Sequence, residues 1–99
     1  MIVKQQTFDL LDFIGELAVD AVADWFKSFR NSSKIDSVTL EGVTYVLKDL
    51  DVYTTTWIIC DWLDDKIDEG ATRINLIYNV KEDNPDDLVR VEINLDYGQ

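Results

Sequence analysis

The sequence has no histidine and only one cysteine, and these shortages exclude several classes of protein. Without histidine the chain has no Ser-His-Asp or Cys-His catalytic base and no imidazole ligand for a metal ion. The single cysteine, Cys60, forms no internal disulfide and no thiolate zinc site. We therefore predict a protein that is not an enzyme and that carries no cofactor and no metal ion.

Long apolar runs are also lacking. The longest covers residues 57–60, whereas a membrane-spanning helix requires about 20 apolar residues. Asp9, Asp12 and Glu16 interrupt the apolar character of the first residues, so we expect no secretory signal. With no signal and a lone thiol, the expected location is the cytoplasm and no membrane partner is predicted.

Positive charge is scarce, because 9 Lys or Arg stand against 20 Asp or Glu and the net charge at pH 7 is −11. Nucleic-acid binding depends on cations that neutralise phosphates, so direct binding to nucleic acid is not expected. What the chain does have is 46% hydrophobic and 11% aromatic residues, which predict a folded protein rather than a disordered one. Its 99 residues suit a single domain over 1–99.

Residues 8–30 predict a long amphipathic helix. Thr7 is a suitable N-cap, and Lys27 and Arg30 suit the last turn because cations stabilise the C-terminal end of a helix dipole. Apolar residues at helical spacing form the side predicted to be buried. They are Leu11, Ile14, Ala18, Val22, Trp25 and Phe29.

Alternation of apolar and polar residues predicts strands in the rest of the chain. Residues 36–48 predict a hairpin around the dipeptide at positions 41–42. Residues 72–81 and 88–97 alternate most regularly, and they predict an antiparallel pair with one buried and one solvated side. The six residues between them, which include the only proline, predict a loop.

Two interpretations compete for residues 50–69. The β-branched and aromatic residues of 52–60 favour a strand, whereas the spacing of Cys60, Leu63 and Ile67 before Gly70 favours a helix. We predict a helix over 54–69. Its inner stripe would be Val52, Thr56, Ile59, Cys60, Leu63 and Ile67. The expected fold is α+β, an antiparallel sheet of about four strands packed on two helices in the order αββαββ.

The first candidate binding surface is an acidic row on the predicted first helix. Steps of three or four residues keep the carboxylates on one side of a helix, about 6 Å apart along its axis. Such a row can stand in for the phosphates of a nucleic acid, and an aromatic residue within it is typical of an interface anchor. The alternative is an ordinary solvated surface. The residues are Asp9, Asp12, Phe13, Glu16, Asp20 and Asp24.

The second candidate surface lies on the predicted second helix, where acidic residues accompany two tryptophans. Large aromatic groups beside charged ones suggest a partner or dimer contact. The alternative is that Trp57 belongs to the core, which would follow if residues 52–60 were a strand. The residues of this surface are Trp57, Asp61, Trp62, Asp64, Asp65 and Asp68.

Size and charge together favour a binding function. The chain resembles, in size and charge only, the phage-encoded anti-restriction and anti-CRISPR inhibitors and the immunity proteins that neutralise nuclease toxins. That resemblance implies an acidic inhibitor, or DNA mimic, that occupies the cationic groove of a basic nuclease or DNA-binding protein. The alternatives are a structural or dimerisation module, such as a phage accessory protein or a homodimer, whose acidity only provides solubility, and adaptation to high salt.

Overall fold

The computed structural model describes residues 2–10, 18–29, 35–46 and 52–98. These residues form an α+β domain with two helices and five strands. The elements follow in the order β1 (Ile2–Asp9), α1 (Ala18–Lys27), β2 (Ser37–Leu40), β3 (Val43–Val46), α2 (Val52–Asp68), β4 (Ala71–Lys81) and β5 (Asn84–Tyr97).

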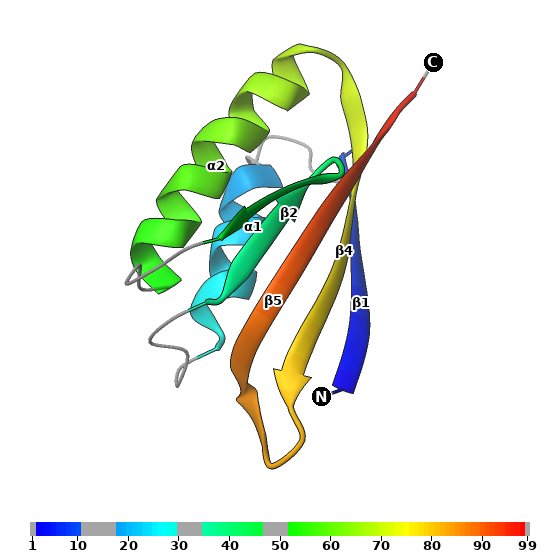
Figure 1. Cartoon of the computed structure of the whole chain (residues 1–99). Coiled ribbons are helices and arrows are strands. Elements are labelled where there is room, and N and C mark those ends of the chain that lie inside the picture. Colours follow the sequence, from blue (N-terminus) through cyan, green and yellow to red (C-terminus); the bar gives the residue numbers. More distant parts are fainter. Residues whose placement is uncertain (1, 11–17, 30–34, 47–51, 99) are drawn as a thin grey trace.

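The five strands form one mixed sheet in the spatial order β1-β4-β5-β2-β3. Three of the four strand pairs are antiparallel, and β2 runs parallel to β5. Both helices lie against the same side of this sheet, and the other side is open (Figure 1). The prediction of an antiparallel sheet of about four strands in the order αββαββ is therefore wrong in detail, because a fifth strand, β1, precedes α1 and one strand pair is parallel.

The core lies between the helices and the central strands β4 and β5. Phe26 of α1 and Leu63 of α2 are fully buried against Ile74 and Ile93 of those strands. Trp25 packs edge-on against Phe26, Phe29 and Tyr78, with ring centroids 4.8, 4.9 and 4.9 Å apart. Edge-to-face contacts of this kind are favourable for aromatic rings and tie α1 to β4.

The predicted helix over 8–30 is wrong at its beginning. Phe8 and Asp9 belong to β1, where they pair with Ile74 and Arg73 of β4. Pairing with a distant strand decides their conformation, and a helical pattern read along the chain does not contain that information. The prediction holds over Ala18–Lys27, where Val22 is buried.

Both predicted hairpins are present. The β2–β3 turn is formed by Glu41 and Gly42, whose φ angles of 47° and 86° are those of a type I′ turn. The β4–β5 turn is shorter than predicted, because β5 already begins at Asn84 and only two residues separate the strands. Register shifts near Val80 let β5 bend at this end.

The second helix confirms the helical interpretation of residues 50–69, and the strand alternative is wrong. Thr56, Ile59 and Leu63 of the predicted inner stripe are buried, and Cys60 and Ile67 are half-buried. The side chain of Val52 lies outside the described residues. Neither of the two helices that the structure describes is long and apolar enough to cross a membrane.

Candidate functional site

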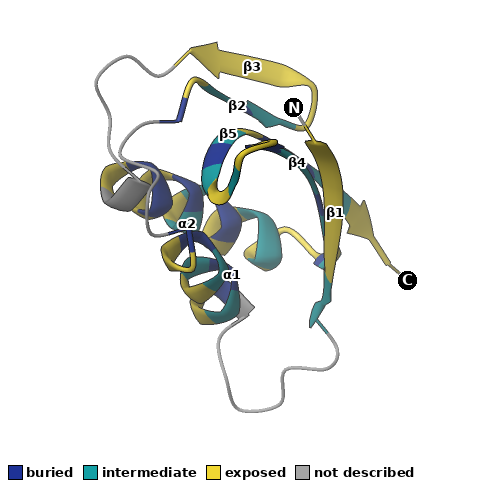
Figure 2. Ribbon diagram, turned by 90° about the horizontal axis from the view of Figure 1, so that it is seen from below, coloured by how far each residue is buried: buried dark blue, intermediate teal, exposed yellow. Residues whose placement is uncertain are grey.

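A groove of about 310 Å³ lies between α1 and α2 and is lined by residues of both helices. The two helices lie side by side, as Figure 2 shows. The buried or half-buried residues of the lining form the floor, and the exposed ones form the rim. The floor consists of Val19, Ala23, Thr56 and Cys60, and the rim consists of Asp20, Lys27, Trp57, Asp61 and Asp64.

Helical spacing explains why α2 presents these residues together. Trp57, Asp61 and Asp64 are separated by four and three residues, so they lie on one side of the helix. Thr56 and Cys60 lie beside them and are less exposed, and the Cys60 thiol lies 4.0 Å from the backbone carbonyl oxygen of Val19 in α1. From α1, Asp20 contributes the third carboxylate of the rim.

Trp57 is the most exposed large hydrophobic side chain among the described residues, at 73%. An indole in water is costly, because burying an aromatic side chain of this size removes about 150–250 Å² of largely apolar surface from solvent. It shares the rim of the groove with Asp61 and Asp64. A cationic side chain that enters the groove can meet both the carboxylates and the indole, where cation–π attraction adds to the charge interaction.

The electrostatic character of the groove is visible at the Cys60 thiol, whose pKa is raised above its ordinary value of 9.0. Burial is the largest cause, and the charges of Asp64, Asp61 and Asp20 add to it. Lys27 lowers the pKa, but its effect is the smallest of the five. Three carboxylates against one ammonium therefore leave the groove negative.

Titration of Cys60 gives a direct test of this field. We expect the pH dependence of iodoacetamide alkylation to show a thiol pKa above 9.0. Asp64→Asn should move that pKa downward, because a neutral amide no longer opposes the thiolate. Asp83→Asn, at the β4–β5 turn, is the matched control and should leave it unchanged. An equal pKa in the Asp64 variant and the parent would contradict the arrangement of charges described here.

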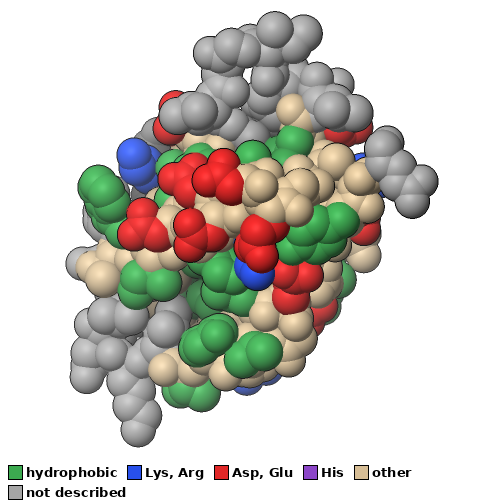
Figure 3. Space-filling view, turned by 90° about the horizontal axis from the view of Figure 1, so that it is seen from above, with side chains coloured by type: hydrophobic (Ala, Val, Ile, Leu, Met, Phe, Trp, Pro, Cys, Tyr) green, Lys and Arg blue, Asp and Glu red, His purple; other side chains and the backbone are tan. Residues whose placement is uncertain are grey.

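The structure joins residues of the two predicted binding surfaces in one groove. The lining of this groove includes Asp20 from the first predicted surface. It also includes Trp57, Asp61 and Asp64 from the second. Asp24 on α1 and Asp65 and Asp68 on α2 are exposed nearby but are not part of its lining. Figure 3 shows acidic side chains gathered over the α2 side of the molecule, with hydrophobic side chains between them.

Other predicted site residues lie elsewhere. Asp9 is not on a helix: it is in β1, where its carboxylate lies 3.9 Å from the Arg73 guanidinium of β4. The single acidic row on one helix is therefore wrong at this residue. Trp62 is half-buried and packs against the core rather than standing free. Asp12, Phe13 and Glu16 lie outside the described residues.

Local sequence patterns do not indicate the floor of the groove or the position of Lys27 on its rim. Helical spacing indicates which residues share a side of one helix, but it does not indicate how two helices are rotated against each other. Lys27 was assigned only to the helix C-terminus, a role that its position in the last turn of α1 still allows.

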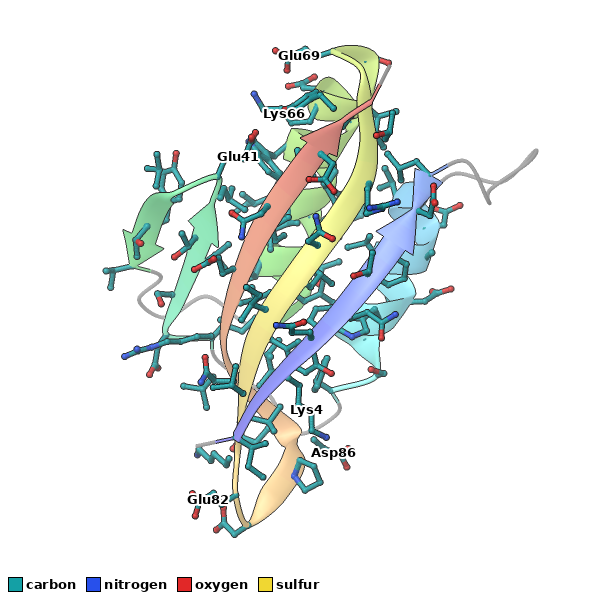
Figure 4. The ribbon with its side chains drawn as sticks, turned by 90° about the vertical axis from the view of Figure 1, so that its right-hand side faces the viewer. Lys4, Glu41, Lys66, Glu69, Glu82 and Asp86 are labelled. Atoms are coloured by element: carbon teal, nitrogen blue, oxygen red, sulfur yellow. The ribbon has the colours of Figure 1, made fainter. Side chains whose placement is uncertain are left out.

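A second hollow, of about 550 Å³, lies on the open side of the sheet and was not predicted. Its lining mixes both signs of charge with hydroxyl groups, including Arg90, Glu92, Thr39 and Thr44. Figure 4 shows this side of the sheet crossed by polar side chains. Its described lining residues include no exposed aromatic ring, and they carry a smaller excess of negative charge than the lining of the groove between the helices, so we place the candidate site at the groove.

Fold and site together define a small α+β domain with an acidic groove between two helices and an exposed tryptophan on its rim. No group of three or more metal-ligating side chains comes together within the described residues. No protein-family model, no curated protein and no solved structure matches the chain.

Proposed function

We propose that this protein binds a basic, nucleic-acid-handling protein through the α1–α2 groove and blocks its cationic surface without chemistry of its own. The observation that carries the proposal is the position of Trp57, 73% exposed, among carboxylates contributed by two different helices. An exposed aromatic ring on a rim where three carboxylates outnumber one ammonium has the composition of a binding hot spot with its polar rim.

Two further features support a basic partner. The net charge of −11 accelerates encounters with a cationic surface by electrostatic steering. The rim carboxylates can form charge-assisted hydrogen bonds with Arg and Lys side chains, which are among the strongest hydrogen bonds in proteins. A protein that handles nucleic acid presents such side chains to phosphates, and carboxylates can occupy the same positions.

The test is affinity capture from cells of the source organism at low and moderate salt, followed by competition with purified components. We expect capture of a nuclease or DNA-binding protein whose binding to nucleic acid is lost when this protein is added. Added salt should weaken the complex, because it screens the attraction between opposite charges. Capture of no basic protein, or capture of one that still binds nucleic acid, would contradict the proposal.

Removal of the rim charges locates the contact. The triple variant Asp20→Asn, Asp61→Asn and Asp64→Asn should weaken binding about tenfold, since exposed charge pairs contribute about 0.2–1 kcal/mol each and about 1.4 kcal/mol is one power of ten. The control, Glu82→Gln with Asp83→Asn and Asp86→Asn, removes the same charge from the β4–β5 turn and the beginning of β5. Equal affinities of the two triple variants, measured by calorimetry, would remove the groove from the interface.

A further inference from the structure

The two edges of the sheet differ in their protection. The strand β3 forms one edge, and it exposes three large hydrophobic side chains: Val43 at 55%, Tyr45 at 51% and Val46 at 71%. Figure 2 shows β3 lying beyond the helices, so neither α1 nor α2 covers it. An uncovered strand edge offers unpaired N–H and C=O groups to any strand that can approach it.

The other edge, β1, carries the protection that β3 lacks. Lys4 pairs with Tyr78 of β4, a residue on the helix-covered side, so β1 places a charge where an added strand would have to bury it. Lysine on an edge strand and an inward-pointing charge both oppose edge-to-edge pairing. The four residues of β3, Val-Thr-Tyr-Val, include no charge at all.

The hairpin fixes which groups of β3 face outward. In a hairpin closed by a two-residue turn, Val43 and Tyr45 direct their backbone groups to Leu40 and Val38 of β2. Thr44 and Val46 therefore direct theirs away from the sheet. Thr44 and Val46 lie on either side of Tyr45. Their outward-facing N–H and C=O groups can hydrogen-bond to an identical antiparallel strand, with Thr44 of one copy opposite Val46 of the other.

We propose that β3 pairs antiparallel with β3 of a second copy of this chain, about a two-fold axis at Tyr45, which joins the two five-stranded sheets into one. The two Tyr45 rings meet across the axis on the helix side, and Val46 packs against Thr44 on the open side. A two-fold symmetric contact uses the same surface patch on both subunits, so the uncharged strand β3 of each copy forms one half of the dimer interface. This inference is independent of the proposed function.

Charge favours a second copy over a basic partner as the occupant of this edge. A basic partner is attracted to carboxylates, and β3 has none, whereas two chains of net charge −11 can approach each other only where charge is lowest. The repulsion between the rest of the two molecules is screened by salt. Dimerisation therefore strengthens as salt is added, whereas binding to a basic partner weakens.

The mass in solution tests the pairing. Light scattering at 0.1–1 mM protein should give twice the 11.4 kDa of the chain, with the dimer fraction rising between about 0.05 and 0.5 M NaCl. Tyr45→Lys should give a monomer, because two ammonium groups would face each other across the axis. Val46→Lys, at a 71% exposed position that tolerates lysine without unfolding, should do the same. The control Val3→Lys, on the β1 edge, should remain dimeric.

An engineered disulfide between the two copies tests the position of the proposed two-fold axis. Residues directly opposite in a non-hydrogen-bonded antiparallel pair have Cα atoms about 4.5 Å apart, within the range of about 4.4–6.8 Å that a disulfide spans. In a Cys60→Ser background, Tyr45→Cys should therefore cross-link into a dimer on mild oxidation, and Val3→Cys should not. A parent that stays at 11.4 kDa in every condition overturns the proposal. So does a dimer that Val3→Lys dissociates and the β3 variants leave intact.

Discussion

Replacing Phe26 with alanine is expected to lower the free energy of unfolding by about 3–5 kcal/mol. Phe26 is fully buried, and its ring contacts Trp25 edge-on at 4.8 Å in the layer between α1 and the sheet. Truncation removes the transfer free energy of the ring and leaves a cavity that the surrounding strands fill only in part. Domains of this size are stable by about 5–15 kcal/mol in total, so the variant should be close to unfolding at 25 °C.

Urea unfolding followed by circular dichroism measures this loss. Trp57→Ala is the matched control, because it also truncates an aromatic residue on a helix but at a 73% exposed position. It should change the unfolding free energy by no more than about 0.5 kcal/mol. If both variants lost the same stability, the assignment of Phe26 to the core and of Trp57 to the surface would be wrong.

The spacing of apolar, polar and glycine residues along the sequence correctly predicted the elements whose conformation depends on neighbouring residues. The β4 and β5 strands show regular alternation, and the β2–β3 turn has glycine at position 42, where φ is 86°. The second helix was predicted from apolar spacing that ends at Gly70, although its first nine residues are rich in β-branched and aromatic types. Burial of Ile59 and Leu63 against the sheet outweighs that strand propensity.

The elements that were missed are the ones decided by distant contacts. The strand β1 contains Lys4, Gln5 and Gln6 in succession, so no alternation of apolar and polar residues marks it, and pairing with β4 makes it a strand. The parallel pairing of β2 with β5 joins segments about 50 residues apart, and neither sequence specifies the direction of its neighbour. The groove is missed for the same reason, because it depends on how α1 packs against α2.

The proposed interface and the proposed dimer occupy different parts of the molecule. The groove lies between the helices, and the unprotected edge is β3, which belongs to the sheet and lies beyond both helices. A dimer paired through β3 therefore leaves both grooves open and presents two acidic surfaces to basic partners. Added salt weakens the groove contact and strengthens the dimer contact, so the two contacts can be measured separately in one protein.

Replacing Trp57 with alanine is expected to weaken binding of the basic partner by at least about 2 kcal/mol, which is about a thirtyfold increase in Kd. Among the described residues the indole is the one large aromatic group on the rim of the groove, so its removal takes away both the apolar contact and the cation–π attraction to a bound Arg or Lys. The loss should appear as faster dissociation, because contacts at the centre of an interface act mainly on the dissociation rate.

The comparison that decides this is kinetic, by surface plasmon resonance with the captured partner immobilised. Trp57→Phe should retain most of the affinity, since it keeps an aromatic face, and Ile58→Ala, a truncation of the neighbouring 49% exposed side chain, should leave Kd within about threefold of the parent. The Asp20, Asp61 and Asp64 triple variant should instead slow association, because its charges act by steering. A Trp57→Ala protein that folds normally and dissociates at the parental rate would show that the groove is not where the partner binds.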